Sequence, residues 1–220
     1  MHIMEGFLDP IWCAVWFVIA IPIVALGAKK VIELMRDHPE HKMTIALSGA
    51  FIFLLSSLKI PSVTGSSSHP TGTGFAVVMY GIATCAFLST IVLIFQAILL
   101  AHGGLTTLGA NICSMGIIGP AAGLGIWLML IKSGAKIPVA LLCAAFIADL
   151  VTYVVTAFQM SLNFGFEYFI DYLSNYAVTQ IPLAIVEAIL FFMFGMYLMN
   201  NKPEIFDIAQ GMSDAKKEEA

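Results

Sequence analysis

The residues from Phe75 to Ala101 form a run of 27 residues without one charged side chain. A helix that crosses a bilayer needs about 20 predominantly apolar residues. The whole chain has this character, because 60% of its 220 residues are hydrophobic and only 11% are charged. Soluble domains average about 45–50% apolar and about 25% charged residues, so a soluble core cannot hold this excess. The sequence therefore predicts a polytopic, all-α integral membrane protein rather than a soluble domain.

Apolar runs of similar character recur along the chain. Five of them are clear candidates for spanning helices: Pro10–Ala28, Met43–Leu58, Asn111–Ile131, Ile137–Met160 and Ala177–Met199. The run Phe75–Ala101 is either one long tilted helix or two short ones, and Gly81 near its middle is suited to a tight turn. A short span at this place requires protein or a water-filled cavity around it.

The positions of lysine and arginine decide between these two alternatives, because cytoplasmic loops collect both residues. If the run splits after Tyr80, nine of the ten cations lie inside and only Lys59 lies outside. With one long helix there are six spans, and the two halves of the chain disagree about orientation. We therefore expect a bundle of about seven transmembrane helices, with the N-terminus outside and the C-terminus cytoplasmic.

This topology divides the chain into a single membrane-embedded domain, residues 1–199, and a polar cytoplasmic tail, residues 200–220. It places four segments together on the outer face: residues 1–9, Lys59–Thr73, His102–Thr106 and Ser161–Tyr176. Residues 1–9 carry no positive n-region and no cleavage-site pattern, so we expect Met1 to be the true N-terminus.

Several classes of function are disfavoured. The formal net charge is −4 and there is no basic face, which argues against nucleic acid as a partner. The sequence holds no GxxxxGK[ST] motif, so energy for active transport must come from another subunit or an ion gradient. The four cysteines lie in apolar runs without CxxC spacing and are expected to be buried thiols: Cys13, Cys85, Cys113 and Cys143.

Two histidines stand out on the predicted outer face. His2 follows the α-amine by one residue, and His69 lies in a loop rich in glycine, serine and threonine. The amine of Met1 and the amide and imidazole nitrogens of His2 would close fused chelate rings on one metal ion, and His69 would supply a fourth nitrogen. Four nitrogens in a plane suit Ni(II) or Cu(II) and also accommodate Co(II). From spacing alone, two solvated surface histidines remain the alternative.

Polar side chains also lie within the predicted spans. Asp149 and Glu187 fall in the sixth and seventh spans, and Gln96 and Asn111 lie near the outer ends of the fourth and fifth. Such groups mark functional sites by default in a bilayer, although helix capping and hydrogen bonds between helices are the structural alternative. A membrane-embedded enzyme would use Asp149, Glu187 or His102 as acid–base groups, and a proton-coupled transporter would use the two acids. We expect these groups at unrelated depths.

Two further patterns have simpler interpretations. Gly119, Gly123 and Gly125 provide small faces on which helices can pack closely. The segment His38-Pro-Glu-His41 lies among mixed charges and is expected to be a solvated loop rather than a metal site.

Three separate segments carry a resemblance to a known family. They are Met1-His-Ile-Met-Glu-Gly-Phe-Leu8, then Ser68-His-Pro-Thr-Gly-Thr-Gly74, and then Gly103-Gly-Leu-Thr-Thr-Leu-Gly-Ala-Asn111 continued by Ser114-Met-Gly-Ile-Ile-Gly-Pro120. In this order they resemble the CbiM/NikM family, the substrate-specific S components of energy-coupling factor (ECF) transporters for cobalt and nickel. The family often has Gly-Pro between its third and fourth spans, whereas this chain reads Tyr80-Gly-Ile.

The resemblance implies a metal site at the outer face. Its ligands would be the amine of Met1, the amide and imidazole nitrogens of His2, and the imidazole of His69. The polar residues expected around these ligands are Ser67, Gln96 and Asn111. Seven spans also fit the family, in agreement with the charge pattern.

The resemblance further implies a transport subunit rather than an enzyme, located in the plasma membrane of a prokaryote. Its substrate would be Co(II), imported for cobalamin synthesis, with Ni(II) as the alternative, and no cofactor is implied. The implied partners are a small membrane subunit (CbiN), a transmembrane coupling protein (CbiQ) and ATPase subunits (CbiO), which would account for the missing ATP-binding motif.

Overall fold

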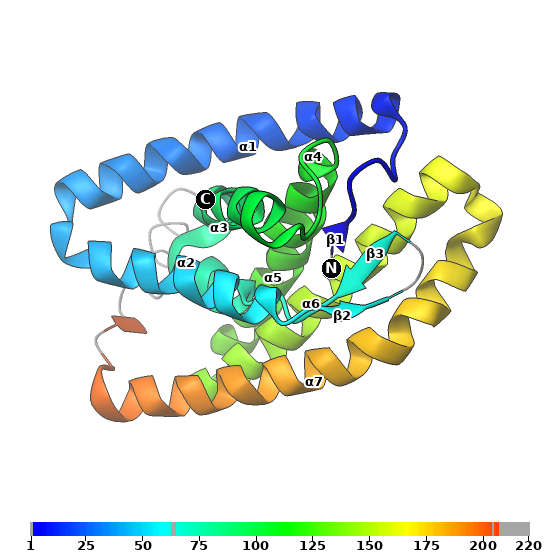
Figure 1. The fold of residues 1–220 in the computed structure, drawn as a ribbon. Helices are drawn as coiled ribbons and strands as arrows, with labels where there is room; N and C mark the ends of the chain where they lie inside the picture. The colour runs from blue at the N-terminus through cyan, green and yellow to red at the C-terminus, as the bar shows by residue number, and fades with distance from the viewer. Residues whose placement is uncertain (1, 63–64, 204, 207–220) are drawn as a thin grey trace.

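The computed structural model describes residues 2–62, 65–203 and 205–206. Five stretches of helix in this part of the chain are long and apolar enough to cross a membrane. They are α1 (Pro10–Asp37), α3 (Thr73–Leu100), Leu108–Lys132, α6 (Ile137–Phe164) and α7 (Phe169–Asn201). In Figure 1, α1 and α7 border the molecule on opposite sides, with α3 and α5 between them. The chain is therefore a helical integral membrane protein, as predicted.

The helix α2 (Lys42–Ser57) is shorter than these five. It follows the 3-10 turn η1 (Pro39–His41) and has 16 residues. At 1.5 Å per residue it extends about 24 Å, less than the about 30 Å of a bilayer's hydrocarbon core. Its bounds agree with the predicted stretch Met43–Leu58.

The helix α3 is a hairpin of two helical arms. At Gly81, φ is 78° and ψ is 176°, a left-handed conformation that glycine adopts without steric cost. The Cys85 thiol approaches the carbonyl oxygen of Thr73 at 3.9 Å, although twelve residues of straight helix would extend about 18 Å. The chain thus turns back at Gly81, which confirms the predicted break. The number of crossings and their orientation remain predictions.

The first arm of this hairpin is enclosed by protein. Every residue from Thr73 to Gly81 is buried. The eight helical residues 73–80 extend only about 12 Å, too little to cross a bilayer alone. This short arm therefore meets the condition stated for a short span, since neighbouring helices rather than lipid surround it.

The predicted span Asn111–Ile131 is irregular. It consists of α4 (Leu108–Asn111), a π-helical segment η2 (Ile112–Ile118) and α5 (Gly119–Lys132). Single π-helical turns often occur beside functional sites. Beyond this segment, a Cβ atom at Gly123 would lie 2.6 Å from the Ala144 carbonyl oxygen of α6, which confirms close packing there. The same prediction is wrong for Gly125, because its Cβ position has no neighbour within 4 Å.

A small sheet joins three segments between α1 and α7, toward the right-hand end of the bundle in Figure 1. Its strands are β1 (His2–Ile3), β2 (Ile60–Pro61) and β3 (Ser66–Ser68), in the antiparallel order β1-β3-β2. His2 pairs with Ser67, and Ile3 pairs with Ser66. The all-α prediction did not include this sheet, which places the N-terminal residues beside the loop that carries His69.

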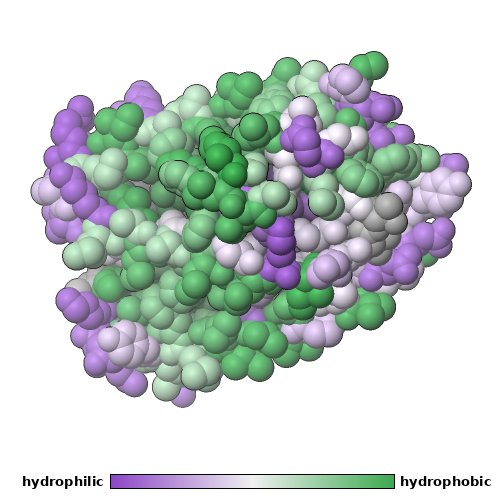
Figure 2. Space-filling view, in the orientation of Figure 1, coloured by the Kyte–Doolittle hydropathy of each residue, from purple (hydrophilic) through white to green (hydrophobic). Residues whose placement is uncertain are grey.

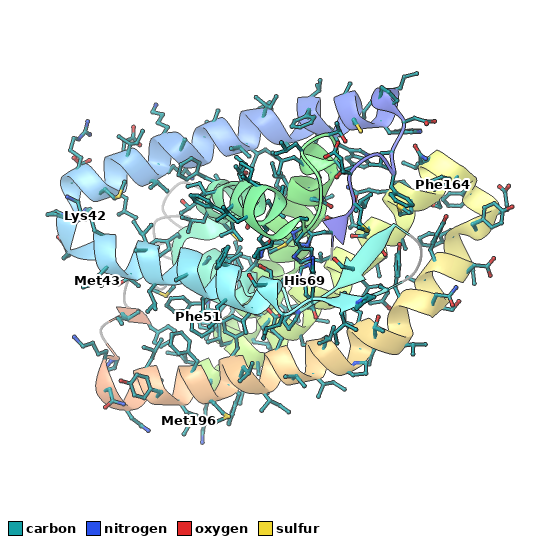
Figure 3. The ribbon with its side chains drawn as sticks, viewed as in Figure 1. Lys42, Met43, Phe51, His69, Phe164 and Met196 are labelled. Carbon is teal, nitrogen blue, oxygen red and sulfur yellow. The ribbon has the colours of Figure 1, made fainter. Side chains whose placement is uncertain are left out.

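Contacts confirm that the four predicted outer segments share one end. The Lys59 Nζ donates to the Leu100 carbonyl at 3.2 Å, and the Asp9 backbone N–H donates to the Asn163 Oδ1 at 2.7 Å. In Figure 3, Lys42 and Phe164 mark opposite ends of the bundle. Of the predicted tail 200–220, residues 207–220 lie outside the described residues.

Several predicted helix bounds are wrong because the helices run further than their most apolar cores. The helix α1 continues to Asp37, so the loop expected from Lys29 begins only after it. The predicted outer loop Ser161–Tyr176 is reduced to residues 165–168, which include the 3-10 turn η3 (Phe166–Tyr168). Polar residues at these helix ends do not interrupt the backbone hydrogen bonds.

The surface carries the apolar belt of a membrane protein. Figure 2 shows hydrophobic residues over most of the middle of the molecule and hydrophilic residues mainly toward its two ends. Val18 of α1 and Val178 of α7 are 72% and 74% exposed. Such surfaces are stable against lipid but not against water. All four cysteines are free thiols. Cys13, Cys85 and Cys113 are buried as expected, whereas the prediction is wrong for Cys143, which is only half-buried.

Candidate metal centre

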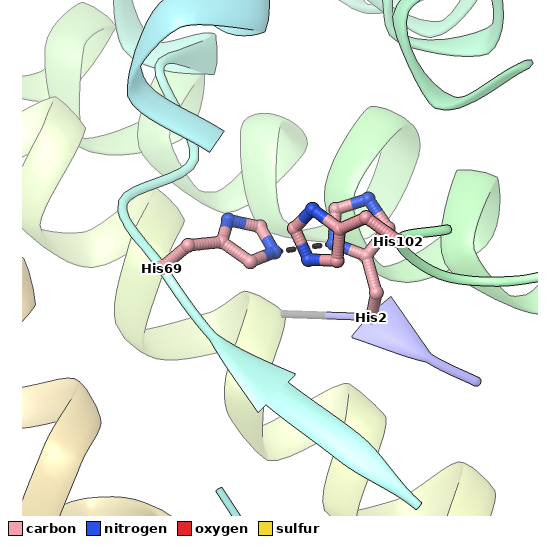
Figure 4. A group of neighbouring side chains, drawn as sticks. All are labelled: His2, His69 and His102. Atoms are coloured by element: carbon pink, nitrogen blue, oxygen red, sulfur yellow. Dashed lines mark hydrogen bonds between the residues drawn. The ribbon is translucent and has the colours of Figure 1, made fainter. Parts of the chain in front are cut away.

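Three histidines from separate segments converge at the end of the bundle that holds the sheet. His2 lies in β1, His69 follows β3, and His102 follows α3. Their exposed fractions are 0%, 0% and 2%, and one ring nitrogen of each lies within 4.8 Å of the others. Figure 3 shows His69 in the interior of the bundle, and Figure 4 shows the three rings gathered together.

The closest approach is between His2 Nδ1 and His69 Nε2, which make a direct contact (Figure 4). The two ring centroids are 4.4 Å apart. Two ring nitrogens can face each other only if a proton or a metal ion lies between their lone pairs. Because both rings are fully buried, the alternative of two solvated surface histidines is wrong for this pair.

The segment of residues 2–9, here called the N-terminal carrier, is fixed by side chains of the chain around α4. The Asn111 side chain accepts from the Ile3 backbone N–H at 2.7 Å and donates to the Ile3 carbonyl at 3.0 Å. Thr107 Oγ1 donates to the same carbonyl at 2.8 Å. Further out, the Glu5 carboxylate accepts from the backbone N–H groups of Leu105, at 2.5 Å, and Thr106, at 3.2 Å. These bonds set the position of His2.

The segment of residues 66–72, here called the His69 carrier, is fixed by α7. Glu187 accepts from the Thr71 N–H at 2.5 Å, the Gly72 N–H at 2.8 Å and the Thr71 hydroxyl at 3.0 Å. The Gln180 Nε2 donates both to the His69 carbonyl, at 3.0 Å, and to the Asp149 carboxylate, at 2.7 Å. The expectation of unrelated depths for Asp149 and Glu187 is wrong, because both acids support this one segment.

The sequence indicates His102 only as an acid–base group, not as a companion of His2 and His69. Its Nε2 lies 2.8 Å from Ser67 Oγ, and its ring centroid lies 4.3 Å from that of His2. The next residue, Gly103, has φ of 78°, and a Cβ atom there would lie 3.0 Å from the His2 ring. Glycine therefore lets this loop lie directly against His2. A histidine beside a Gly-Gly pair was the available signal.

Ser67, Gln96 and Asn111 all lie around the three rings. Ser67 contacts His102, Asn111 holds the backbone next to His2, and Gln96 donates to Ser56 Oγ at 2.7 Å. Gln96 also lies near enough to His2 to favour its protonated form slightly. No described atom forms a hydrogen bond of normal geometry with His2 Nε2 or Gln96 Oε1.

The surroundings keep the three imidazoles neutral. Burial lowers the pKa of His2 well below 6.5, and the other two rings lower it further. Burial likewise lowers the pKa of His69 well below 6.5. For His102, burial and the positive charge of Lys59 contribute to a pKa of about 3. Neutral rings keep a lone pair free, which is the form of histidine that binds a metal.

A second group of potential ligands lies at the opposite end of the bundle. His38, Glu40 and His41 also bring one ligand atom each within 4.8 Å of one another, but they are largely exposed. The His38 Nδ1 contacts the Glu40 carboxylate at 3.2 Å. This is the solvated loop that the mixed charges predicted.

Met1 lies outside the described residues, so its amine remains a predicted ligand. The described part of the site offers nitrogen ligands. Imidazole nitrogen suits Co(II), Ni(II), Cu(II) and Zn(II), whereas Mg(II) and Ca(II) prefer sites rich in oxygen.

Comparisons with known proteins agree with this chemistry. Residues 2–205 match the CbiM family, described as the cobalt uptake substrate-specific transmembrane region. A protein named cobalt transport protein CbiM, from Nostoc sp., is 45% identical over 224 residues, covering 98% of this chain and 86% of its own length. A CbiM relative from Methanocaldococcus jannaschii is 48% identical over 209 residues, covering 93% of this chain and 90% of that relative.

Two crystal structures share the fold. One, described as a transition metal transporter, has a TM-score of 0.81 at 24% identity, and the match covers 91% of this chain and 93% of that one. A truncated transition metal transporter has a TM-score of 0.80 at 24% identity, covering 91% and 99%.

Proposed function

Since this chain belongs to the CbiM family of cobalt uptake proteins, we propose that it is the substrate-binding subunit of an ECF-type importer of Co(II). Family membership establishes that the chain is a membrane component of cobalt uptake. The proposal adds the metal site, the driving subunits and the purpose, which is cobalamin synthesis in a prokaryotic cell.

The observation that carries the proposal is the buried contact between His2 Nδ1 and His69 Nε2, which lie 67 residues apart in the chain. A chain beginning with Met-His can hold a metal through its amine, the amide nitrogen of His2 and the His2 imidazole. In that chelate the ring nitrogen that closes the smaller ring is Nδ1, the nitrogen that faces His69. The His69 imidazole then supplies the fourth nitrogen of a plane.

Distances in such a plane agree with this arrangement. Metal–nitrogen bonds of about 2.0 Å place neighbouring ligands about 2.8 Å apart. The two ring nitrogens therefore need only a small separation to receive an ion between them. In both carriers a side chain from another segment donates a hydrogen bond to a backbone carbonyl: Asn111 to that of Ile3, next to His2, and Gln180 to that of His69. The site is therefore largely preformed.

Import would need subunits beyond this chain. The sequence has no ATP-binding motif of the P-loop type. We infer that the ATPase pair CbiO and the coupling protein CbiQ drive access to the site, with CbiN as a small membrane partner. This chain would bind and release the ion without covalent chemistry, so it is a transport protein rather than an enzyme.

Metal titration of the detergent-purified, untagged chain tests the proposal. We expect one Co(II) or Ni(II) ion per chain, weak or absent binding in His2→Ala, and a fall by orders of magnitude in His69→Ala. His38→Ala is the matched control, because it removes an exposed imidazole at the other end of the bundle. Equal affinity in all four proteins would overturn the proposed site.

A second experiment tests the Met1 amine by placing one additional residue before Met1. The extension removes the amine from the chelate but leaves both imidazoles and the helices intact. We expect tight binding to be lost while the thermal unfolding midpoint of the metal-free protein stays unchanged. Undiminished binding by the extended chain would show that the amine is no ligand.

A nickel importer with the same site is the nearest alternative, and competition between Co(II) and Ni(II) in the same titration decides it. A proton-coupled transporter would instead use Asp149 or Glu187 for protons. Their hydrogen bonds support a role in holding the His69 carrier. We therefore expect Asp149→Asn to weaken metal binding and transport together, whereas a proton-coupled transporter would lose transport and keep binding.

A further inference from the structure

His102 separates the His2–His69 pair from a pocket on the protein surface. This pocket has a volume of about 350 Å³, and its lining includes Met4, Lys59, Ser66, Ser67, His102 and Gly103. Neither His2 nor His69 contributes to its wall. An ion that arrives through the pocket therefore meets the His102 side of the cluster first.

One nitrogen of His102 is free to bind a metal. Its Nε2 is engaged by Ser67 Oγ at 2.8 Å, whereas its Nδ1 is buried and has no hydrogen-bond partner among the described residues. A buried polar nitrogen without a partner is rare and requires an explanation. The hydrogen bond at one ring nitrogen also fixes the ring orientation, as partners of metal-binding histidines commonly do.

The position of the ring indicates which coordination site it could fill. The His102 ring is nearly perpendicular to the His69 ring, at 88°, with 5.0 Å between their centroids. In the proposed function, four nitrogens already occupy the plane around the ion. Any further ligand must then approach from above or below that plane. His102 is a candidate for this position, because it brings one ring nitrogen within 4.8 Å of the ring nitrogens of His2 and His69.

We propose that His102 is a fifth, apical ligand and that it makes the site favour Co(II) over Ni(II). This inference rests on the proposed planar site of Met1, His2 and His69. In a strong planar field of four nitrogens, Ni(II) pairs its eight d electrons and fills the orbital that points at the apical position, so it gains little from a fifth ligand. Co(II) has one electron fewer, and its half-filled apical orbital accepts one donor. The apical imidazole therefore stabilises bound Co(II) selectively.

Comparing two metals in the same variant tests the selectivity. Even partners one shell away from a metal contribute about 10–100-fold to affinity, so His102→Ala should weaken Co(II) binding by at least about tenfold. Ni(II) binding should change by less than about threefold, since no planar ligand is lost. His38→Ala serves as the imidazole control. Equal losses for both metals, or no loss for either, would overturn the proposal.

A measurement on the unaltered protein avoids any folding defect of the variant. Low-spin Co(II) couples magnetically to the nucleus of its apical ligand, so the electron paramagnetic resonance spectrum of the Co(II)-loaded chain should show a nitrogen triplet. Labelling with ¹⁵N-histidine should convert this triplet to a doublet. His102→Asn should remove the splitting while Co(II) still binds. A triplet that survives ¹⁵N-histidine labelling would contradict an apical imidazole.

Metal binding by the unaltered chain and its variants distinguishes an error in the planar site from an error in the apical ligand. If the unaltered chain binds neither Co(II) nor Ni(II), or if His2→Ala keeps full affinity, the planar site itself is wrong. If binding depends on His2 and His69 but not on His102 for either metal, the planar site stands and the apical ligand is wrong.

Discussion

The two segments that bring His2 and His69 together are held in the protein in different ways. The N-terminal carrier has inner hydrogen bonds with Thr107 and Asn111. Its outer bonds are exposed: Glu5 accepts from the Leu105 N–H, and the Asp9 N–H donates to Asn163. The His69 carrier is bound by Gln180 and Glu187, and both side chains have an exposed fraction of 0%.

This difference indicates which half of the site can move. A segment held partly by exposed hydrogen bonds opens locally at lower cost than a segment bonded to buried helix residues, which moves only with the core. We therefore expect the N-terminal carrier to open and close over the ion. The His69 carrier should instead follow α7, which makes α7 the element through which coupling subunits could reach the site.

The largest expected effect is a pH dependence of Co(II) affinity that comes from the N-terminal carrier and not from the His69 carrier. Burial holds the pKa of His2, His69 and His102 below 6.5, so above pH 6.5 the imidazoles release no protons on binding. The amine and the amide each release one, so between pH 6.5 and 7.5 the affinity for Co(II) should rise about a hundredfold. Isothermal titration in several buffers checks this. An affinity independent of pH would mean that the N-terminal carrier offers only its imidazole.

Glu187→Gln should loosen the His69 carrier. The substitution replaces a carboxylate that accepts three hydrogen bonds by an amide with one acceptor oxygen. Hydrogen bonds to charged groups contribute about 1.5–3 kcal/mol, so we expect a comparable loss of unfolding free energy and weaker metal binding. Thermal unfolding in detergent measures it. Glu33→Gln, on an exposed side chain of α1, is the control, and an equally small effect of both would refute the assignment of Glu187.

Asn111→Ala should release the N-terminal carrier with less damage to the fold. It removes both hydrogen bonds to the Ile3 backbone, each worth about 1 kcal/mol. Together these correspond to about a thirtyfold loss of metal affinity. We expect faster hydrogen exchange in residues 2–9 while the exchange of α7 stays slow. Exposed Asn201→Ala should change neither, and a global rise in exchange for Asn111→Ala would contradict separate anchoring.

Glu5→Gln should have the smallest effect, because its bonds lie in solvent. The Thr106 hydroxyl contributes most to a pKa of Glu5 below 4.5. A carboxylate with a lowered folded-state pKa contributes its stabilisation fully above pH 4.5 and loses it as the pH falls through that lower value. We expect a loss of affinity of about two- to fivefold in Glu5→Gln at neutral pH. Limited proteolysis of the N-terminal carrier should rise below pH 4.5 only in the unaltered protein.

The sequence predicts the helices well because hydrophobicity in a bilayer leaves few alternatives. The break at Gly81 followed from charge placement and from glycine's conformational freedom. The ends of α1, α6 and α7 did not follow, because polar residues such as Asn163 can continue a helix beyond the apolar core. The sheet formed by β1, β2 and β3 was missed since its strands have only two or three residues each.

The candidate site was predictable only in part for a different reason. His2 and His69 were singled out by their local sequences, whereas the approach of His102 depends on where the loop after α3 returns. Local spacing would equally have favoured His38 and His41, which are close in sequence but largely exposed. Burial, which neither spacing nor composition reveals, distinguishes the two groups.

X-ray absorption at the cobalt edge of the Co(II)-loaded chain tests the central claim most directly, because it reports the atoms around the ion. The account predicts a shell of nitrogen atoms at about 2.0 Å with the outer-shell scattering of imidazole rings. This scattering should fall in His69→Ala and stay unchanged in His38→Ala. A shell of oxygen atoms without imidazole scattering would contradict the joint site of His2 and His69.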